Sequence, residues 1–359
     1  MKSRIIQIVN SIEDVDNNYS NQYREDYLRF TRNRYICNHL NTNVRTFQEL
    51  IVAGYVGWSC AISEAVIDNI DSQLVQKQSS IYVTIHLGPY KAIPRVLLKK
   101  GMNVCIPVTE RVFFNQKKEY DVLVDDIEGP HGSLEFVNIE NKQGLIKMLK
   151  LIKQGFSVLF YIDGNSGIGG MERNDEKLLD YEFAYKTIKI RKGIDFFTNK
   201  LGLPIIPVVS YLEFNNNWTY KSNIIVPQYN SFSRCSTTHI AIQMWDLFSE
   251  YINKYASQWE AWLYIDAFFK EKEWTKINCS LDTDILRFNN QRYDFFSNSN
   301  GIYLYDILNN TKVAISQSLF DILIDIKKSD KEILKDDFLS ILRGKDTLME
   351  SLINYQIMI

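Results

Sequence analysis

The chain has 359 residues, of which 45% are hydrophobic and 23% charged, so it can bury a large core and is not of the disordered class. Its 41 Lys and Arg residues against 43 Asp and Glu give a net charge of −2, which argues against a protein that coats nucleic acid. The five cysteines and four histidines are scattered without metal-ligand or C-x-x-C spacing, so we expect no metal site, no disulfide framework and no tightly bound cofactor.

Apolar runs in this sequence are short. The N-terminal run is too brief for the core of a signal peptide, and no window approaches the length that spans a bilayer. We therefore expect a cytoplasmic protein with no transmembrane segment, for which peripheral contact with a membrane stays open.

The residue pattern divides the chain into three regions. Residues 1–45 are polar and predict an irregular, partly helical lead-in. In residues 46–270 predicted strands alternate with helices, which indicates an α/β domain with a mixed, largely parallel sheet flanked by helices. After a polar linker, residues 284–359 predict short strands followed by three helices, a small α+β domain.

Periodicity and turn residues locate the elements of the central region. The run SVLFYI at 157–162 is continuously apolar, as is typical of a buried parallel strand. The other expected strands are 81–85, 103–107, 134–139, 203–212 and 219–226. The expected helices are one or two within 47–75, then 91–100, 142–153, 193–201 and 239–255.

Two polar side chains follow predicted strands directly. His86 follows the strand 81–85, and Asp163 follows the strand 157–162. Ligands of open α/β sheets bind outside the carboxyl ends of the strands. A histidine at that edge either acts as a general base near neutral pH or hydrogen-bonds backbone at the strand end.

The segment from His86 to Lys91, HLGPYK, resembles the His-x4-acid motif of the glycerolipid and lipid A late acyltransferase superfamily, which also contains a glycine and an aromatic residue. Two later segments, GLIKMLKLIKQGFSVLFYIDGNSG and KIRKGIDFFTNKLGLPIIPVVSYLE, are similar to that superfamily's helix, strand and Asp loop and to its G-x-P-I-I-P-V block. QWEAWLY resembles its tryptophan-containing closing segment, so the resemblance covers about residues 50–270.

The resemblance implies transfer of a fatty acyl group from a thioester, carried by coenzyme A or an acyl carrier protein, to a hydroxyl or amine. His86 would remove the acceptor's proton, and the motif's acid would hold the imidazole. Lys91 occupies the acid position, offers only donors and would lower the pKa of His86. Three alternatives follow: Asp163 or Glu110 replaces the acid, the histidine acts unassisted, or catalysis is lost.

Seven further residues are candidates for substrate binding: Gly88, Tyr90, Glu110, Arg111, Gly164, Asn165 and Arg191. Gly88 would let backbone approach the substrate, with N–H groups of the next helix at the oxyanion. Arg111 would meet a phosphate of the donor, and Arg191 precedes a helix N-terminus where an anion is favoured. The alternative for the two arginines is that they are ordinary surface residues. The alternative for Asp163-Gly164-Asn165 is that it forms a turn.

The C-terminal region has a resemblance of its own. LRFNNQRYDFFSNSNGIYLYDILNNTKVAISQSLFDIL is similar to small winged-helix domains that bind leader peptides in ribosomal-peptide maturation. Those domains add an extended peptide to a sheet edge. The alternative is a domain that packs on the rest of the chain.

Taken together, these patterns lead us to expect an acyltransferase that uses His86 as its base and acts on a hydroxyl or amine acceptor, such as a peptide or small metabolite held by the C-terminal domain. The competing expectation is a binding protein of the same fold, catalytically degenerate, that recognises a peptide or a carrier protein. Lys91 is the residue that favours the second.

Overall fold

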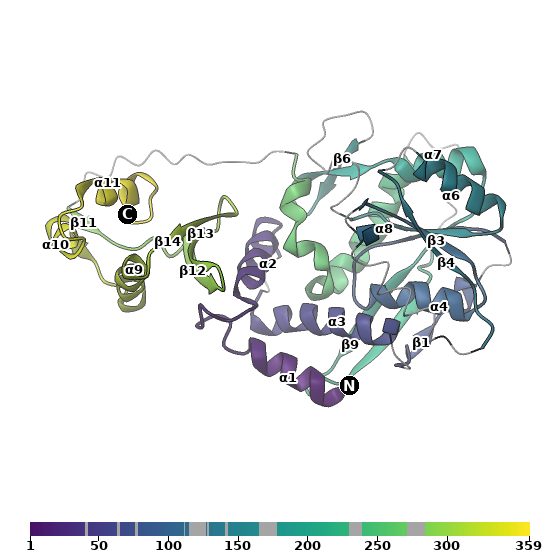
Figure 1. The fold of residues 1–359 in the computed structure, drawn as a ribbon, viewed down its shortest axis with the longest axis horizontal. Coiled ribbons are helices and arrows are strands. Elements are labelled where there is room, and N and C mark those ends of the chain that lie inside the picture. The colour runs from purple at the N-terminus through teal and green to yellow at the C-terminus, as the bar shows by residue number, and fades with distance from the viewer. Residues whose placement is uncertain are drawn as a thin grey trace. The chain divides into compact units, whose positions relative to one another are not determined.

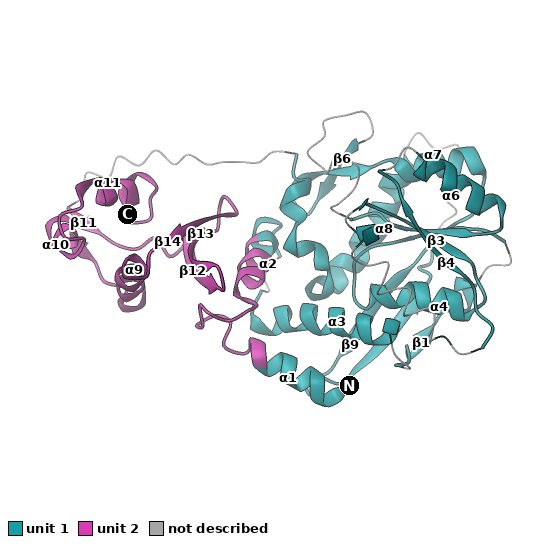
Figure 2. Cartoon of the chain, viewed as in Figure 1, with its two compact units in different colours: residues 1–10, 33–271 teal, residues 11–32, 272–359 magenta. Residues whose placement is uncertain are grey.

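The computed structural model describes residues 1–39, 42–62, 65–75, 78–110, 112–114, 127, 129–140, 143–164, 178–229, 239–270 and 284–359 (Figure 1). The chain forms two compact units, each discontinuous in sequence (Figure 2). Unit 1 comprises residues 1–10 and 33–271, and unit 2 comprises residues 11–32 and 272–359. The lead-in is therefore divided between the two units at two places, after residue 10 and after residue 32, and each place lies inside a helix.

Unit 1 is built on a five-stranded sheet. Its strands are β2 (Ile81–Thr84), β3 (Val104–Val108), β4 (Leu134–Asn138), β5 (Ser157–Tyr161) and β8 (Ile205–Pro207). They lie in the order β4-β3-β5-β2-β8, and every neighbouring pair is parallel. All four residues of β2 are buried, as its apolar sequence requires. The prediction of an α/β fold with a largely parallel sheet is confirmed.

Helices cover the two faces of this sheet. They are α4 (Ile93–Lys99), α6 (Gly144–Lys153) and α7 (Gly193–Leu201), with α8 (Ile240–Lys254) packed on α7. The connection from β2 through α4 runs to β3, and the connection from β5 through α7 runs the opposite way to β8. Because such crossovers are right-handed, α4 and α7 lie on opposite faces. The sheet therefore has a switch point between the carboxyl ends of β2 and β5, where α/β proteins bind their ligands.

Two parts of unit 1 differ from the predicted elements. The single strand expected over 203–212 is two, because β8 ends at Pro207 and β9 (Val209–Phe214) pairs instead with β10 (Tyr220–Ile225), which also pairs with β1 (Asn69–Ile70). Between the two strands, Val208 donates its backbone N–H to the carbonyl of Val83 in β2 at 2.8 Å. The hairpin of β6 (Leu178–Phe183) and β7 (Lys186–Arg191) was not predicted at all.

The N-terminal residues are more helical than expected. They form α1 (Lys2–Ile12) and α2 (Arg24–Ile36), followed by α3 (Val44–Ile62) and the short 3-10 turn η1 (Ser72–Leu74). Helix α2 has no apolar stripe, and its Arg24 and Arg34 are buried. A polar helix that buries arginines gives no hydrophobic period to detect, which explains why the pattern indicated irregular structure.

In unit 2 a small antiparallel sheet is followed by three helices, as predicted. The strands β12 (Tyr293–Asn298), β13 (Gly301–Asp306) and β14 (Thr311–Ile315) pair in sequence order. The helices are α9 (Gln317–Ser329), α10 (Lys335–Ile341) and α11 (Asp346–Asn354), with a two-residue pair of β11 (Ile285–Leu286) and β15 (Ile333–Leu334) beside them. Their core includes the fully buried Phe295, Leu323, Phe338 and Met358.

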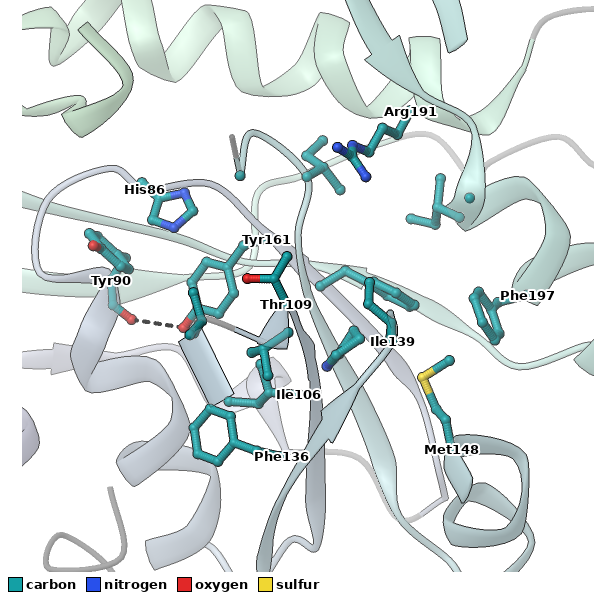
Figure 3. A pocket seen from close by; sticks show the side chains of 18 of the residues that line it. His86, Tyr90, Ile106, Thr109, Phe136, Ile139, Met148, Tyr161, Arg191 and Phe197 are labelled. Carbon is teal, nitrogen blue, oxygen red and sulfur yellow. Dashed lines mark hydrogen bonds between the residues drawn. The ribbon is translucent and has the colours of Figure 1, made fainter. Parts of the chain in front are cut away.

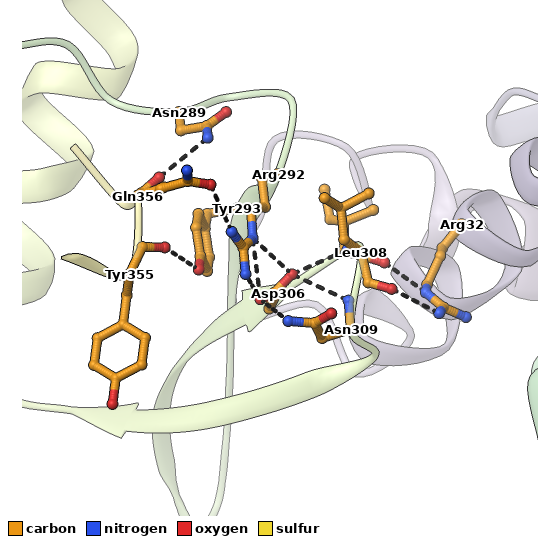
Figure 4. A network of polar contacts seen from close by, with 10 residues as sticks. Arg32, Asn289, Arg292, Tyr293, Asp306, Leu308, Asn309, Tyr355 and Gln356 are labelled. Carbon is orange, nitrogen blue, oxygen red and sulfur yellow. Dashed lines mark hydrogen bonds and ion pairs between the residues drawn. The ribbon is translucent and has the colours of Figure 1, made fainter. Parts of the chain in front are cut away.

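A polar network ties the turns of unit 2 together (Figure 4). Arg292 donates to Asp306 Oδ2 at 2.8 Å and to Gln356 Oε1 at 2.9 Å. Asp306 also accepts from Asn309 Nδ2 at 2.9 Å. The guanidinium of Arg32 donates to the carbonyl of Leu308 at 2.8 Å. These bonds join the start of β12, the β13–β14 turn, the C-terminal residues and α2.

Within the described parts of the chain, the structure contains no helix that is both long and apolar enough to cross a bilayer. Cys37, Cys60 and Cys105 are buried. The other two cysteines and the linker expected at 270–283 lie outside the described residues, except for Lys270.

The N-terminal segment of unit 2 makes a testable contribution through Arg24. Its guanidinium is 3% exposed and donates to Asp294 Oδ2 at 2.9 Å and to the carbonyls of Phe295 and Val15. We expect Arg24→Met to destabilise unit 2 by about 3 kcal/mol, because it leaves a partly buried carboxylate and two carbonyls without this donor. Hydrogen exchange should show lost protection in β12 and β13.

The matched control is Arg29→Met on the same helix. Arg29 is 32% exposed, against 3% for Arg24, and it pairs with Glu25 one helical turn away, so its loss should change protection little. Equal effects of the two substitutions, or a loss confined to the strands of unit 1, would contradict the assignment of residues 11–32 to unit 2.

Candidate active site

The candidate site is centred on His86 and Asp163, which follow the adjacent strands β2 and β5. His86 Nδ1 lies 2.7 Å from Asp163 Oδ1. The backbone N–H of His86 donates to both carboxylate oxygens, at 2.9 and 3.1 Å. Since Nδ1 faces the carboxylate, we assign the proton to Nδ1, which leaves the lone pair of Nε2 free to accept a proton.

Asp163 is fully buried, and a third group completes its bonding. The indole Nε1 of Trp259 donates to Asp163 Oδ2 at 2.7 Å. The next residue along the chain, Glu260, donates its backbone N–H to the carbonyl of His86 at 2.9 Å. The segment 259–260 therefore holds both members of the pair, and the carboxylate is positioned to orient the imidazole as a triad acid does.

Gly88 fixes the turn that follows His86. Its φ of +58° lies in the left-handed region, and a Cβ there would be 2.7 Å from the carbonyl oxygen of Ser210 and 2.7 Å from Tyr211 Cα. Glycine is required on both counts. The close approach that it permits is to β9, whereas the sequence had suggested an approach to the substrate.

The environment of His86 favours its protonated form. Burial is the largest influence and disfavours the charge, but the charge of Asp163, its hydrogen bond and the charge of Glu260 together raise the pKa of His86 above 6.5. Lys91 acts in the opposite direction, as expected from the sequence. The expectation that Lys91 would leave the histidine a weaker base is wrong for the net effect, because two carboxylates outweigh one ammonium.

Lys91 belongs to a second charged group at the same end of the site. Its Nζ lies 3.8 Å from Glu260 Oε2 and 4.9 Å from the ring centroid of Trp58. The hydroxyl of Tyr90 donates to the same oxygen of Glu260 at 2.7 Å. Lys91 thus neutralises Glu260 and does not contact the histidine as the motif's acid would.

A cavity of about 560 Å³ opens beside these residues (Figure 3). His86, Tyr90, Lys91, Glu260 and Tyr264 line one end of it. Burial and the charges of Asp163 and Glu260 hold the pKa of Tyr264 well above its usual value, so it stays a phenol and can donate.

The cavity continues along the carboxyl edge of the sheet and becomes apolar. Its far walls come from β3, β4, α6 and α7, with side chains of Ile106, Phe136, Ile139, Leu145, Met148, Ile194 and Phe197. A pocket with a polar, hydrogen-bonding end and an apolar extension fits an amphiphile with a long hydrocarbon portion.

The structure also locates the other residues that the sequence singled out. Gly164 and Arg191 line the cavity. Glu110 follows β3, which is separated from β2 by β5, and its backbone N–H donates to Glu140 Oε2 at 2.7 Å. Of the two carboxylates considered as partners of His86, Asp163 is therefore the one that binds it. Arg111 and Asn165 lie outside the described residues.

Four groups at the site were missed from sequence. Trp259, Glu260 and Tyr264 belong to QWEAWLY, a segment that the resemblance covered without giving its residues a role. Tyr161 is the last residue of β5, and its ring centroid lies 5.0 Å from that of His86. Its position directly before the Ile-Asp-Gly turn was the available signal.

Among the described residues, no three His, Cys, Asp or Glu side chains are grouped as metal ligands would be. Comparison with protein-family models and with curated protein sequences finds no match to this chain. The geometry of the site is therefore the basis for assigning a function.

The balance of charges around His86 can be measured directly by NMR titration of its ring protons. We expect a midpoint above 6.5 in the wild type. Glu260→Gln should lower it by removing an attractive charge, and Lys91→Met should raise it by removing a repulsive one.

Lys100→Met is the matched control, since Lys100 is exposed and caps the far end of α4. It should leave the midpoint unchanged. If Glu260→Gln and Lys91→Met move the midpoint in the same direction, the electrostatic account of this site is wrong.

Proposed function

We propose that unit 1 is an acyltransferase that moves a fatty acyl group from a thioester of coenzyme A or an acyl carrier protein to a hydroxyl or amine. The observation that carries the proposal is the 2.7 Å bond between His86 Nδ1 and the buried Asp163, at the polar end of a cavity that becomes apolar. A buried carboxylate, an oriented histidine and an apolar channel are what a base-catalysed acyl transfer needs.

In this reaction His86 Nε2 takes the proton of the acceptor as its oxygen or nitrogen attacks the thioester carbonyl. The tetrahedral intermediate then collapses, the carbon–sulfur bond breaks, and the imidazolium returns the proton to the thiolate. Asp163 holds the tautomer and stabilises the imidazolium, acting through His86. The phenol of Tyr264 and the ammonium of Lys91 are the donors at this end of the cavity.

The carboxylate that binds His86 helps to decide whether the site is active or degenerate. The motif's acid position holds Lys91 in this sequence. Asp163, which follows the neighbouring strand, supplies a carboxylate to Nδ1 of His86 instead. An unassisted histidine is therefore not needed to explain catalysis, which favours the active enzyme over the binding protein.

The test is release of thiol from acyl-coenzyme A and acyl-carrier thioesters, with water in place of the unknown acceptor. We expect His86→Ala to lower the rate by about 10²- to 10⁴-fold and Asp163→Asn by about 10²-fold. Because the base must be neutral, the rate should rise with pH to a plateau, with a midpoint above 6.5.

His131→Ala is the control, because His131 is exposed and its Nδ1 bonds the carbonyl of the adjacent Gly132. It should leave the rate unchanged. Release that is equal in the wild type and in His86→Ala, or absent with every donor, would sink the acyltransferase proposal.

For unit 2 we propose a peptide-binding role, in keeping with the resemblance to winged-helix domains. The supporting observation is a groove of about 980 Å³ between β14, α9 and α11. Strand β14 is at the end of its sheet and is exposed over Thr311–Ala314, so its outer edge can pair with an added strand. Val313, 60% exposed, and Leu348 contribute to the apolar lining of the groove.

Selection of a displayed random peptide library on the full chain tests this role. Selected peptides should lose about tenfold or more in affinity on Val313→Asp, because the change puts a charge on the groove wall. Ile285→Asp, at a similarly exposed apolar residue outside the groove, should have no effect. Peptides that bind both variants equally would refute the groove as their site.

A further inference from the structure

Thr109 is the one cavity-lining residue of unit 1 whose side-chain oxygen is recorded as buried with no hydrogen-bond partner among the described residues. Thr109 is 6% exposed, and Figure 3 shows it beside Tyr161 among the side chains that line the cavity. Buried hydroxyls are normally bonded, and leaving one without a partner costs free energy. An oxygen in this position is therefore a place where a ligand atom can be recognised.

Strand order gives the position of Thr109 along the cavity. His86 follows β2, Tyr161 ends β5, Thr109 follows β3 and Ile139 follows β4, and these strands are adjacent in that order. Neighbouring strands are about 4.8 Å apart, so Thr109 is about 10 Å from the strand that ends at His86. Tyr161, on the intervening strand, separates the two, so Thr109 is not placed to contact the reacting carbonyl.

The surroundings of Thr109 are apolar. Side chains of Ile106, Phe136, Ile139 and Met148 line the neighbouring part of the cavity. The backbone around Thr109 is fixed, because Val108 accepts from the N–H of Ile139 at 3.0 Å and Thr109 accepts from the N–H of Phe113 at 2.8 Å. A single hydroxyl held rigidly in an apolar wall can form a hydrogen bond with the part of the ligand that lies beside it. The charged groups, in contrast, are at the His86 end of the cavity.

We propose that Thr109 recognises an oxygen substituent, a hydroxyl or a keto group, carried within the hydrocarbon chain of the acyl donor. This inference rests on the proposed function, since it assumes that the acyl chain occupies the apolar part of the cavity. Thr109 would be a specificity-determining residue. Oxygenated chains would bond to it, and unsubstituted chains would leave its hydroxyl buried without a partner.

Binding measured without turnover tests the inference. The probes are dodecanamide and its positional hydroxy isomers, which are neutral and carry no thioester. With the full-length wild type, at least one isomer with its hydroxyl inside the chain should bind about three- to tenfold more tightly than dodecanamide. The position of that hydroxyl would locate Thr109 along the chain.

Two substitutions complete the design. Thr109→Val keeps the shape but removes the hydroxyl, so it should abolish the preference while dodecanamide binds as well as before or better. Thr109→Ser keeps the hydroxyl and should retain the preference. No preference in the wild type, or a preference that survives in Thr109→Val, would overturn the inference.

Failure of the inference can be told from failure of the proposed function. Thiol release that depends on His86, together with equal binding of all the amides, would overturn the role of Thr109 alone. If no amide binds and no thioester is cleaved, both the acyl channel and the acyltransferase proposal are overturned.

Discussion

The burial of one carboxylate determines the arrangement of unit 1 around the site. Asp163 is fully buried and accepts from the backbone and ring of His86 and from the indole of Trp259. These donors come from two segments that are far from Asp163 and from each other in the chain. A buried charge that lost one of them would be costly, so the ends of β2 and β5 and the segment after α8 are held in one arrangement.

The same constraint allows a lysine at position 91. When the histidine's carboxylate partner comes from the same loop as the histidine, that loop must contain an acidic residue. Here the neighbouring strand supplies it, and Lys91 turns instead to Glu260 and the ring of Trp58. The site therefore holds two carboxylates and one ammonium around one imidazole. In this balance the two carboxylates outweigh burial and the ammonium, so the pKa of His86 is raised above its usual value.

Much of the core of unit 1 was predictable because buried parallel strands are apolar throughout. Strand β5 is the clearest example, and β2 and β3 were also found within a residue or two. The β6–β7 hairpin was not, because its turn uses Ala184 and Tyr185 at positive φ, without the glycine or asparagine that normally indicates such a turn. Helix α2 was obscured by its buried arginines, which pair with groups distant in sequence.

The site was predictable to the same extent. Both His86 and Asp163 were recognised because each follows a strand. The choice between Asp163 and Glu110 could not be made, because it depends on which strand lies next to β2, and strand order is set by tertiary packing. Trp259 and Glu260 reach the site from a segment of 3-10 turns whose sequence has no period that would orient its side chains.

The division of the chain has a consequence for its synthesis. Arg24 and Asp294, which are 270 positions apart in the sequence, form a partly buried contact of unit 2. During translation, residues 11–32 leave the ribosome long before the strands that they pack on, whereas nearly all of unit 1 has emerged by residue 271. Because domains fold as units while they emerge, unit 1 can fold first, and the early segment must remain unburied until the last strands arrive. Most of α2 is polar, but Leu28, which packs on Phe296 and Tyr305 in the finished unit, stays exposed throughout that interval.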